Sequence, residues 1–567
     1  MKKPSIKRLK RFLALAKPYW SSEEKGKARL LLGLLVLLLI ADTQFSVYFN
    51  QQSGEFSSAL AAGDGPRFWR SVHFFFYLLM AAVPVYAYYY YVRDKLGNNW
   101  RNWVTHQLVG RYFKNHAFYK LLTNAEVDNP DQRIAEDINS FTKSSLSFLI
   151  LFAGAILQLA AFGHVLWSIS KALVFFLVLY AAVGTAITFG LFGKKMVGLY
   201  YNQRKREADF RFGLVRIREN AESIAMYRGE RQEELHLLGR FSKVFANFNE
   251  IIRVGLRLNL CYYAYNLTTL ALPALIIAPR VLSGELEVGR VVEATGAFSA
   301  ILSALSVFVD NLESLSTFIA GVSRLDVFSR SLKPVALNGH TRIATRNGEK
   351  LAFDDVTLQT PKYERTLVKG LTVSVSGGEG LMIVGPSGCG KSSLLRAMAG
   401  LWNSGSGTIE RPRPEDVMFL PQHAYMILGN LRNQLCYPNL EREVKEEEML
   451  AVLKRVNLPG LIERCGGLEA ELDFEKVLSV GERQRLAFAR VLLNQPKFIL
   501  LDEATSALDP KNEASIYKEL VATGTTIMSV SHHQSLVRYH THVLELDGGD
   551  GWKVHAAKEF RIADDAV

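Results

Sequence analysis

The sequence has few cysteines, and their spacing excludes the small folds that depend on them. The four cysteines, at positions 261, 389, 436 and 465, include no CxxC pair. This argues against a zinc ribbon and a disulfide framework and favours a reduced soluble part that faces the cytosol. The basic N-terminus (KKPSIKRLKR) also lacks the apolar core and small-residue cleavage site of a secretory leader, so we expect no cleaved signal peptide.

Acidic residues are scarce in the first part of the chain but not in the second. Residues 1–335 contain 40 Lys and Arg against 25 Asp and Glu, whereas residues 336–567 contain 27 against 30. The basic excess therefore accompanies the long apolar runs, which all lie in the first part. Basic residues beside apolar spans are typical of membrane proteins. The net charge of +12 thus does not indicate a nucleic-acid partner.

Six apolar segments are long enough to cross a bilayer, which requires about 20 residues per helix. The long connections 92–144 and 194–258 contain 8 and 14 basic residues, and the N-terminal tail is also basic. The turns on the opposite side contain about five, so we predict that both chain ends and both long connections are cytoplasmic. The predicted spans lie near residues 29–48, 69–92, 145–168, 171–193, 259–281 and 292–320.

The two long connections have apolar residues at helical spacing. Residues 204–258 are expected to form an almost continuous amphipathic helix. Connections of this length without structure are uncommon. We therefore expect the membrane helices to extend into the cytoplasm and to contact the soluble domain at their tips.

The composition becomes polar around residues 331–350, where we place the boundary between a membrane domain (1–335) and a soluble domain (336–567). Beyond it, short β-type runs alternate with helical stretches, which predicts an α/β fold. The apolar run Leu381–Val384 leads into a G-x-x-x-x-G-K-S phosphate loop, whose backbone amides would surround phosphates at a helix N-terminus. The predicted ATP-binding residues here are Gly385, Pro386, Ser387, Gly388, Cys389, Gly390, Lys391, Ser392 and Ser393.

An apolar strand at 498–501 ends in the acids Asp502 and Glu503. Alone this pattern is weak, but after a phosphate loop it indicates the second half of an ATP site. We predict that Asp502 and Ser392 bind Mg²⁺ and that Glu503 activates the attacking water as general base.

The octamer LSVGERQR, at residues 478–485, resembles the signature sequence of ABC ATPases, usually LSGGQ. Two positions depart from it, with valine replacing the first glycine and glutamate replacing the glutamine. The resemblance implies that Ser479, Gly481 and Glu482 approach the ATP bound to an opposite subunit, where small residues at a helix N-terminus favour an anion.

The same resemblance assigns roles to residues that lie in the expected order along the chain. Gln422, a predicted catalytic residue and Mg²⁺ ligand, would sense Mg²⁺ and the attacking water. His532, also predicted to be catalytic, would contact the γ-phosphate. Asp509, in the sequence SALD, would couple two ATP sites. Tyr363 is the nearest candidate to stack on adenine.

Further motifs resemble ABC subfamily D, among them MFLPQHAYM at 418–426, GLW at 400–402 and GWK at 551–553. The sequence PYW at 18–20 is similar to the bacterial branch related to the SbmA/BacA peptide and vitamin transporters. In the membrane half, NPDQRI at 129–134 and NAESIA at 220–225 also resemble subfamily D. The first would form the tip that couples to the nucleotide-binding domain, and the second belongs to the long helix after the fourth span. The implied coupling residues are Asn129, Asp131, Gln132, Arg133 and Glu222.

One chain supplies one phosphate loop and one signature, so the resemblance implies a C₂ homodimer that encloses two ATP molecules. The expected protein is an ATP-driven transporter in the bacterial inner membrane that imports a bulky hydrophilic solute, such as a peptide or cobalamin. It would need no obligatory binding protein. Export, and transport of fatty acids or acyl-CoA as in eukaryotic subfamily D, are the alternatives. A protein that only gates with ATP would lack a general base such as Glu503, and six spans exclude a soluble ATPase that acts on nucleic acid.

Ionisable residues within spans usually face the protein interior. Here they are mostly acidic, which favours a neutral or cationic cargo. For Asp310 and Glu313, an alternative is a position near the cytoplasmic end, paired with Arg or Lys of neighbouring helices. The candidate cavity residues are Asp42, His164, Asp310 and Glu313.

Overall fold

The structure is a computed structural model that describes residues 3–121, 129–333, 341–361 and 363–562. It divides into two compact units, Met1–Val335 and Ala336–Val567. The first unit is helical and the second is α/β, which confirms the predicted fold class.

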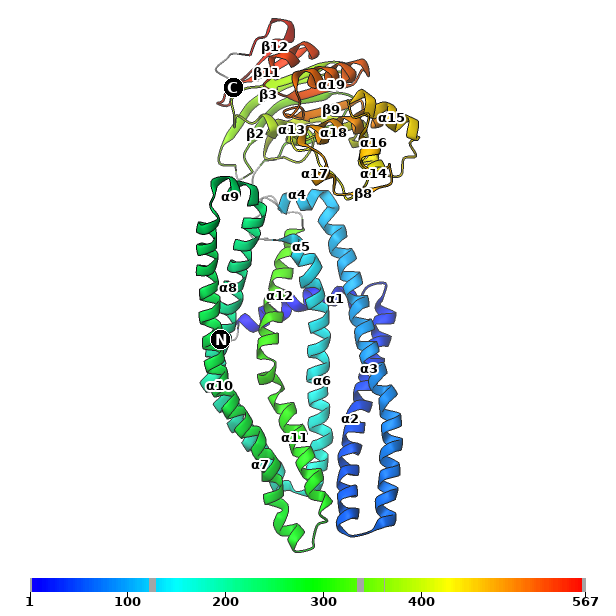
Figure 1. Cartoon of the computed structure of the whole chain (residues 1–567), viewed down its shortest axis with the longest axis vertical. Helices are drawn as coiled ribbons and strands as arrows, with labels where there is room; N and C mark the ends of the chain where they lie inside the picture. Colours follow the sequence, from blue (N-terminus) through cyan, green and yellow to red (C-terminus); the bar gives the residue numbers. More distant parts are fainter. Residues whose placement is uncertain (1–2, 122–128, 334–340, 362, 563–567) are drawn as a thin grey trace. The chain divides into compact units, whose positions relative to one another are not determined.

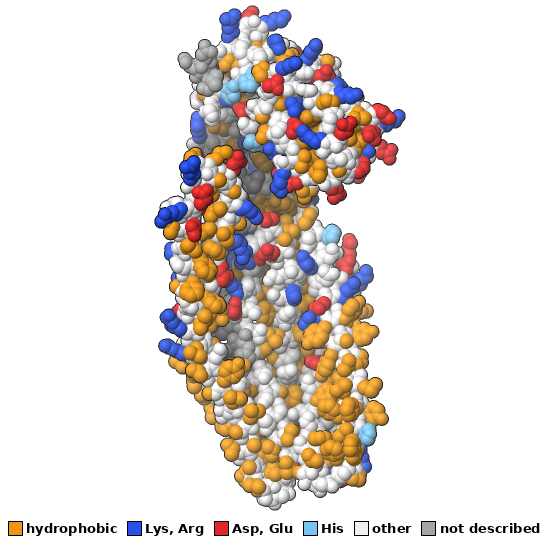
Figure 2. Space-filling view, in the orientation of Figure 1, with side chains coloured by type: hydrophobic (Ala, Val, Ile, Leu, Met, Phe, Trp, Pro, Cys, Tyr) orange, Lys and Arg blue, Asp and Glu red, His pale blue; other side chains and the backbone are white. Residues whose placement is uncertain are grey.

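The first unit consists of long helices that run alongside one another, with α1 lying across them (Figure 1). Within the described residues, six segments are long and apolar enough to span a membrane. Figure 2 shows hydrophobic side chains over much of the lower half of this unit, as expected for a surface that faces lipid. The helices are α1 (Lys3–Trp20), α2 (Lys25–Ala61), α3 (Gly65–Phe113), η1 (Lys114–His116), α4 (Ala117–Leu121), α5 (Pro130–Gln132), η2 (Arg133–Asp137), α6 (Ile138–Ile169), α7 (Lys171–Thr188), η3 (Phe189–Gly193), α8 (Lys194–Glu219), α9 (Ala221–Tyr227), α10 (Glu230–Leu282), α11 (Gly289–Asp310) and α12 (Leu312–Ser331).

The connection after the fourth span forms a helical hairpin, so the prediction of one almost continuous helix over 204–258 is wrong. Helices α8 and α10 pack against each other, and α9 lies at their turn. Arg228 has a left-handed backbone with φ 55°, and the amide of Gly229 donates to the carbonyl of Ile224 at 3.0 Å. This closes α9 in the manner of a Schellman turn. The helical periodicity was correct, but it did not locate the reversal.

The last predicted span, 292–320, is interrupted at Asn311, between α11 and α12. The side-chain amide of Asn311 donates to the carbonyl of Val307 at 2.9 Å. Asparagine side chains that bond to nearby backbone groups compete with the helix and favour its ends. The apolar span therefore covers Gly289–Val307.

Glycines allow α2 and α11 to approach each other closely. A side chain at Gly289 would place its Cβ 1.9 Å from the carbonyl oxygen of Gly54, and one at Gly296 would lie 1.8 Å from Oδ1 of Asn50. The amide of Gly289 also donates to the hydroxyl of Ser58 at 3.0 Å. Small residues bring backbones together at membrane helix contacts in this way.

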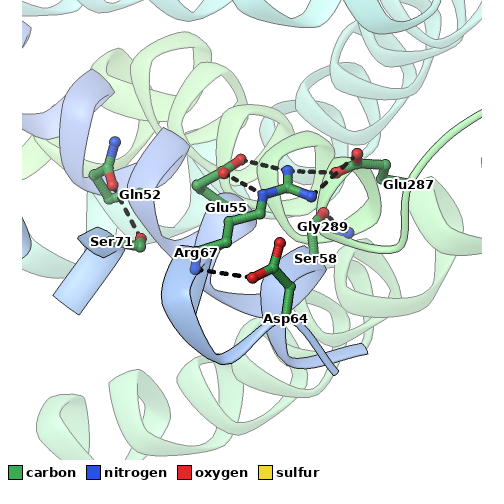
Figure 3. A network of polar contacts seen from close by, with 8 residues as sticks. All are labelled: Gln52, Glu55, Ser58, Asp64, Arg67, Ser71, Glu287 and Gly289. Carbon is green, nitrogen blue, oxygen red and sulfur yellow. Dashed lines mark hydrogen bonds and ion pairs between the residues drawn. The ribbon is translucent and has the colours of Figure 1, made fainter. Parts of the chain in front are cut away.

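Arg67 joins three elements near this contact (Figure 3). Its Nε and Nη2 donate to Glu55 of α2 at 2.6 and 2.9 Å. Its Nη2 and Nη1 donate at 2.8 and 3.3 Å to Glu287, in the turn before α11. Asp64 caps α3 by accepting from the amide of Arg67 at 3.0 Å. The α2–α3 turn is thereby fastened to the α10–α11 turn.

The second unit is built on a six-stranded sheet of order β12-β11-β4-β10-β9-β6, beside a four-stranded sheet of order β1-β5-β2-β3 and the pair β7-β8, as far as the chain is described. The strands are β1 (Ala344–Asn347), β2 (Leu351–Gln359), β3 (Thr366–Val375), β4 (Gly380–Val384), β5 (Gly405–Arg411), β6 (Val417–Leu420), β7 (Gly429–Asn430), β8 (Glu471–Leu472), β9 (Phe498–Asp502), β10 (Thr526–Val530), β11 (His542–Leu546) and β12 (Trp552–Ala556). The helices are α13 (Lys391–Met398), α14 (Leu431–Cys436), α15 (Glu446–Arg455), α16 (Leu461–Arg464), α17 (Phe474–Val477), α18 (Val480–Asn494) and α19 (Pro510–Ala522).

Successive residues of β9 point into two separate cores. Ile499 and Leu501 enter the core that contains α18 and α19, while Phe498 and Leu500 enter the core on the other face. Because β4, β6, β9 and β10 are parallel, the loops that follow them meet at one edge of the sheet. The phosphate loop, Gln422, the Asp502–Glu503 pair and His532 all lie at or after the ends of these strands.

Candidate functional site

The phosphate loop connects β4 to α13. Gly385, Gly388 and Gly390 have φ values of 144°, 77° and 109°, which residues with a Cβ rarely adopt. Lys391 is 7% exposed, and its Nζ donates to the carbonyls of Gly385 and Pro386 at 2.6 and 2.9 Å. The loop thus holds a buried cation at the N-terminal end of α13, where helix amides also favour an anion.

Ser392 and Asp502, both predicted to bind Mg²⁺, lie in direct contact. The Ser392 hydroxyl donates to Oδ1 of Asp502 at 2.7 Å. Burial raises the pKa of the Asp502 carboxyl above its ordinary value. Hydroxyl and carboxylate oxygens are ligands that suit Mg²⁺, and a cation would offset the cost of ionising a buried acid. These two residues therefore fit the metal.

The three predicted catalytic side chains come together. Gln422, after β6, donates through Nε2 to Oε2 of Glu503 at 2.9 Å, and Nε2 of His532, after β10, lies 3.2 Å from Oε1. Gln422, also predicted to bind Mg²⁺, therefore contacts the candidate base. Glu503 has a left-handed backbone with φ 48°, and its amide donates to the carbonyl of Val530 at 3.1 Å. Such strained residues persist where the surrounding structure fixes them, commonly at active sites.

The predicted signature residues begin α18. Ser479 caps this helix, and Glu482 completes a capping box by accepting from the Ser479 amide at 2.9 Å and its hydroxyl at 3.1 Å. Arg464 donates to Glu482 at 2.7 Å, which lowers the pKa of that carboxyl. A Cβ at Gly481 would lie 3.1 Å from the carbonyl oxygen of Ala507. The carboxylate of Glu482 is thus engaged within its own unit, and its role toward nucleotide stays a prediction.

Two further predicted nucleotide residues have local structural partners. Asp509 caps α19 by accepting from the amides of Lys511 and Asn512 at 3.1 and 3.0 Å. Tyr363 has φ 61°, and its hydroxyl donates to the carbonyl of Thr341 at 3.0 Å. The proposed coupling and adenine-stacking roles stay predictions.

Gln484 was missed by the sequence reasoning, although it lies within the signature octamer. It is 2% exposed, and its side chain donates to the carbonyl of Gln422 at 3.3 Å and to the Ser506 hydroxyl at 3.4 Å. It also accepts from the amide of Ala507 at 3.0 Å. Gln484 therefore ties the loop of Gln422 to the SALD segment. A polar residue on the buried face of an amphipathic helix was the available signal.

Glu513 is a second residue that the motifs did not reveal. It is 2% exposed, accepts from the Thr505 hydroxyl at 2.7 Å and lies 2.9 Å from Nδ1 of His533. Thr505 follows Glu503 and His533 follows His532, so Glu513 holds the two segments that bear the candidate base and its imidazole partner.

The predicted coupling residues of the first unit have different environments. Asp131 and Glu222 are exposed, and Asn129 has a left-handed backbone with φ 43°. Gln132 donates to Glu136 at 3.0 Å. Arg133 is buried and pairs with Asp137 at 2.9 Å, an inward contact that the sequence did not indicate.

The first unit contains a pocket of about 1070 Å³, here called the membrane pocket. Of the four predicted cavity residues, Glu313 lines it, paired with Arg204 of α8 at 3.0 Å. The basic partner agrees with one part of the alternative interpretation, and a role of Glu313 toward cargo stays a prediction. Asp42 and His164 are not among the lining residues, and the side chain of Asp310 lies outside the described residues. The lining includes Tyr200, Tyr201, Arg204, Lys205, Tyr262, Glu313 and Arg324.

The acidic cavity expected from the sequence is therefore not what this pocket shows. Its described lining contains three basic side chains and one acidic side chain, together with aromatic rings from α8 and α10. The basic residues come from segments outside the predicted spans, so a count of charges within the spans missed them.

Two family profiles match the chain. The ABC transporter transmembrane region 2 matches residues 15–282, and the ABC transporter domain matches residues 368–506. An uncharacterised ABC transporter ATP-binding protein of Synechocystis is 42% identical, over 93% of this chain and 81% of its own length. The chloroplastic ABC transporter D family member 2 of Arabidopsis thaliana is 36% identical, over 95% and 86%. The lysosomal cobalamin transporter ABCD4 of Homo sapiens is 30% identical, over 97% and 96%.

Among solved structures, a bacterial Atm1-family ABC exporter with ATP bound resembles the chain with a TM-score of 0.74. The match covers 94% of this chain and 96% of that one, at 19% sequence identity. At this identity the likeness concerns the fold, a helical membrane domain with an α/β ATPase domain.

Proposed function

Because the chain belongs to the ABC transporter family, as a half-transporter related to subfamily D, we propose that it works as a homodimer that uses ATP to import a bulky organic solute across the bacterial inner membrane. The meeting of Gln422, Glu503 and His532 beside the Ser392–Asp502 pair carries this proposal. The N-terminal PYW motif supports a place in the bacterial branch related to peptide and vitamin transporters.

The chain's own residues can perform ATP hydrolysis. Lys391 and the loop amides would bind the phosphates, and Ser392 and Asp502 would hold Mg²⁺, which offsets phosphate charge when bound. Glu503 would accept a proton from the attacking water, with Gln422 and His532 orienting its two oxygens. Because Gln422 and His532 already contact the carboxylate of Glu503, the base is oriented before substrate arrives.

The homodimer is proposed because signature and phosphate loop belong to opposite subunits in this family. ATP would act as a ligand that favours the closed dimer, and hydrolysis would remove the γ-phosphate contacts that hold it. We further propose that both termini are cytoplasmic and that the segments around Asn129, Asp131, Gln132, Arg133 and Glu222 transmit closure to the membrane helices. Their places at the ends of long helices support this.

The membrane pocket suggests the character of the cargo. Its volume of about 1070 Å³ suits a bulky molecule, its tyrosines suit an apolar or aromatic body, and its excess of basic side chains favours anionic groups over the cationic cargo first expected. The cobalamin named for the human relative is one candidate. Fatty acids or acyl-CoA, and peptides, are the compounds to compare with it.

Reconstitution tests this function directly. The purified protein in liposomes should accumulate labelled solute only with hydrolysable ATP, and we compare cobalamin, a mixed peptide pool and an acyl-CoA. Accumulation of one class, lost in Glu503→Gln, would support the proposal. Equal leakage of all classes without ATP would contradict it, and loss of preloaded solute on ATP addition would show export.

A further inference from the structure

The N-terminal end of α18 has a negative charge where the proposed function requires it to receive an anion. Ser479 and Gly481 would approach the γ-phosphate of ATP bound to a second copy, and Glu482 lies in the same turn. Its Oε2 accepts from the Ser479 amide at 2.9 Å and from the Ser479 hydroxyl at 3.1 Å. The carboxylate therefore occupies donors that a phosphate would use, and its charge would repel the triphosphate.

Arg464, at the end of α16, offsets this charge. Its Nη1 lies 2.7 Å from Oε1 of Glu482, the oxygen that Ser479 does not use. The Glu482 side chain is 17% exposed, so solvent screens the pair only in part. The contact holds Glu482 through a different oxygen from the one that Ser479 uses, and the ion pair is neutral as a whole.

We propose that Arg464 is a positioning residue for ATP at the signature. By neutralising and orienting Glu482, it allows the start of α18 to accept the γ-phosphate bound to a second copy of this chain. The inference rests on the proposed function, because it requires a dimer that encloses ATP. It adds a residue outside the recognised motifs to the nucleotide site.

Charge rescue tests the proposal in the full-length protein with MgATP. Arg464→Ala leaves Glu482 uncompensated, and its KM for ATP should rise roughly five- to tenfold, equivalent to the loss of about one partly buried charge contact. Its kcat should change little, because Glu503 is untouched. Adding Glu482→Gln to this variant removes the uncompensated charge and should return KM to the value of Glu482→Gln alone. Arg464→Lys preserves the charge and should stay near wild type.

A matched control separates this effect from the general loss of an ion pair. Arg455 pairs with Glu519 at 2.7 Å, and the two side chains are 37% and 35% exposed. Neither residue belongs to a nucleotide motif, so Arg455→Ala should leave KM unchanged. Thermal unfolding of each variant identifies any change in KM that comes from misfolding.

Three results would overturn the proposal. The first is an unchanged KM in Arg464→Ala, and the second is a raised KM in that variant that Glu482→Gln does not reverse. The third is a raised KM in Glu482→Gln alone. This last variant keeps Arg464, so its result does not depend on how Arg464→Ala folds. Failure of the proposed function would appear differently, as wild-type hydrolysis that persists in isolated protomers and is insensitive to Ser479→Ala.

Discussion

A carboxylate in each unit contacts two side chains, but the partners differ in kind. Glu503, in the second unit, receives the neutral amide of Gln422 and the imidazole of His532. Asp137, in the first unit, receives two guanidinium groups, from Arg133 at 2.9 Å and from Arg324 at 2.7 and 3.0 Å. Their side chains are 27% and 7% exposed, respectively.

The difference indicates what each group can do. A buried carboxylate bound by two guanidinium groups is fixed in place, so it suits a structural joint between η2 and α12. A carboxylate that is partly open to solvent and is oriented by an amide and an imidazole is accessible to water, so it suits the role of general base. Three comparisons test this contrast.

The largest effect is expected at Glu503. Glu503→Gln removes the proton acceptor but preserves shape, so hydrolysis should fall about 10²- to 10⁴-fold, the usual contribution of a general base. ATP binding should persist, and the dimer should remain closed. Single-turnover hydrolysis and nucleotide-binding measurements check this. Near-normal turnover would remove Glu503 from its catalytic role.

Asp137→Ala should act on stability instead. It leaves the buried guanidinium of Arg133 without its carboxylate, a change that typically costs about 3 kcal/mol or more. We expect a clear drop in the thermal unfolding midpoint of the protein in detergent, while Glu503→Gln leaves that midpoint unchanged. The control Glu250→Ala breaks the exposed Lys195–Glu250 pair of the same unit and should change the midpoint little. Equal effects of the two alanine variants would contradict the structural role of Asp137.

His540 sharpens the contrast, because it is a buried titratable group whose partners among the described residues are an uncharged hydroxyl and a backbone carbonyl. Its Nδ1 lies 2.9 Å from the carbonyl of Leu536 and its Nε2 lies 2.8 Å from the Ser529 hydroxyl, which suits the neutral ring. Burial lowers the pKa of His540 from 6.5 to about 4. Between these values the unfolded chain binds more protons, so stability is present above 6.5 and is lost as the pH falls toward 4.

At about pH 5 this loss amounts to about 2 kcal/mol. Calorimetry of the full-length protein at about pH 7.5 and about pH 5 measures it through the unfolding transition of the second unit. His540→Gln cannot titrate, so the difference between the two pH values should shrink. An unchanged difference would show that other groups set the acid sensitivity.

The residues of the candidate nucleotide site that the structure brings together could be predicted because they lie in contiguous motifs at the ends of strands. Once β6, β9 and β10 are parallel neighbours, Gln422, Glu503 and His532 must meet at the same edge. Glu513 and Arg464 could not be found in this way. Their function depends on which side chain each one contacts, and that is decided by packing between helices and loops far apart in the sequence.

The membrane half was predictable in its spans but not in its interior. Length and apolarity are sufficient to place six spans. Neither property determines which helix faces turn toward each other, so Arg204 and Tyr262 of the membrane pocket were not predicted. Asp42 is absent from the described lining of that pocket, and its role as a cavity residue stays a prediction. The hairpin turn at Arg228 and the break at Asn311 were also not predicted. Each is set by the backbone of one or two residues, and hydrophobic periodicity is judged over a longer window.

The glycine contact between α2 and α11 restricts how the membrane half can rearrange. Gly289 approaches the backbone of Gly54 directly, so at this point no side chains separate the two helices and sliding of one past the other is hindered. A larger side chain at either position would push α2 and α11 apart. During a transport cycle we therefore expect the two helices to move together as one rigid body at this contact. Any bending of either helix is expected elsewhere along its length.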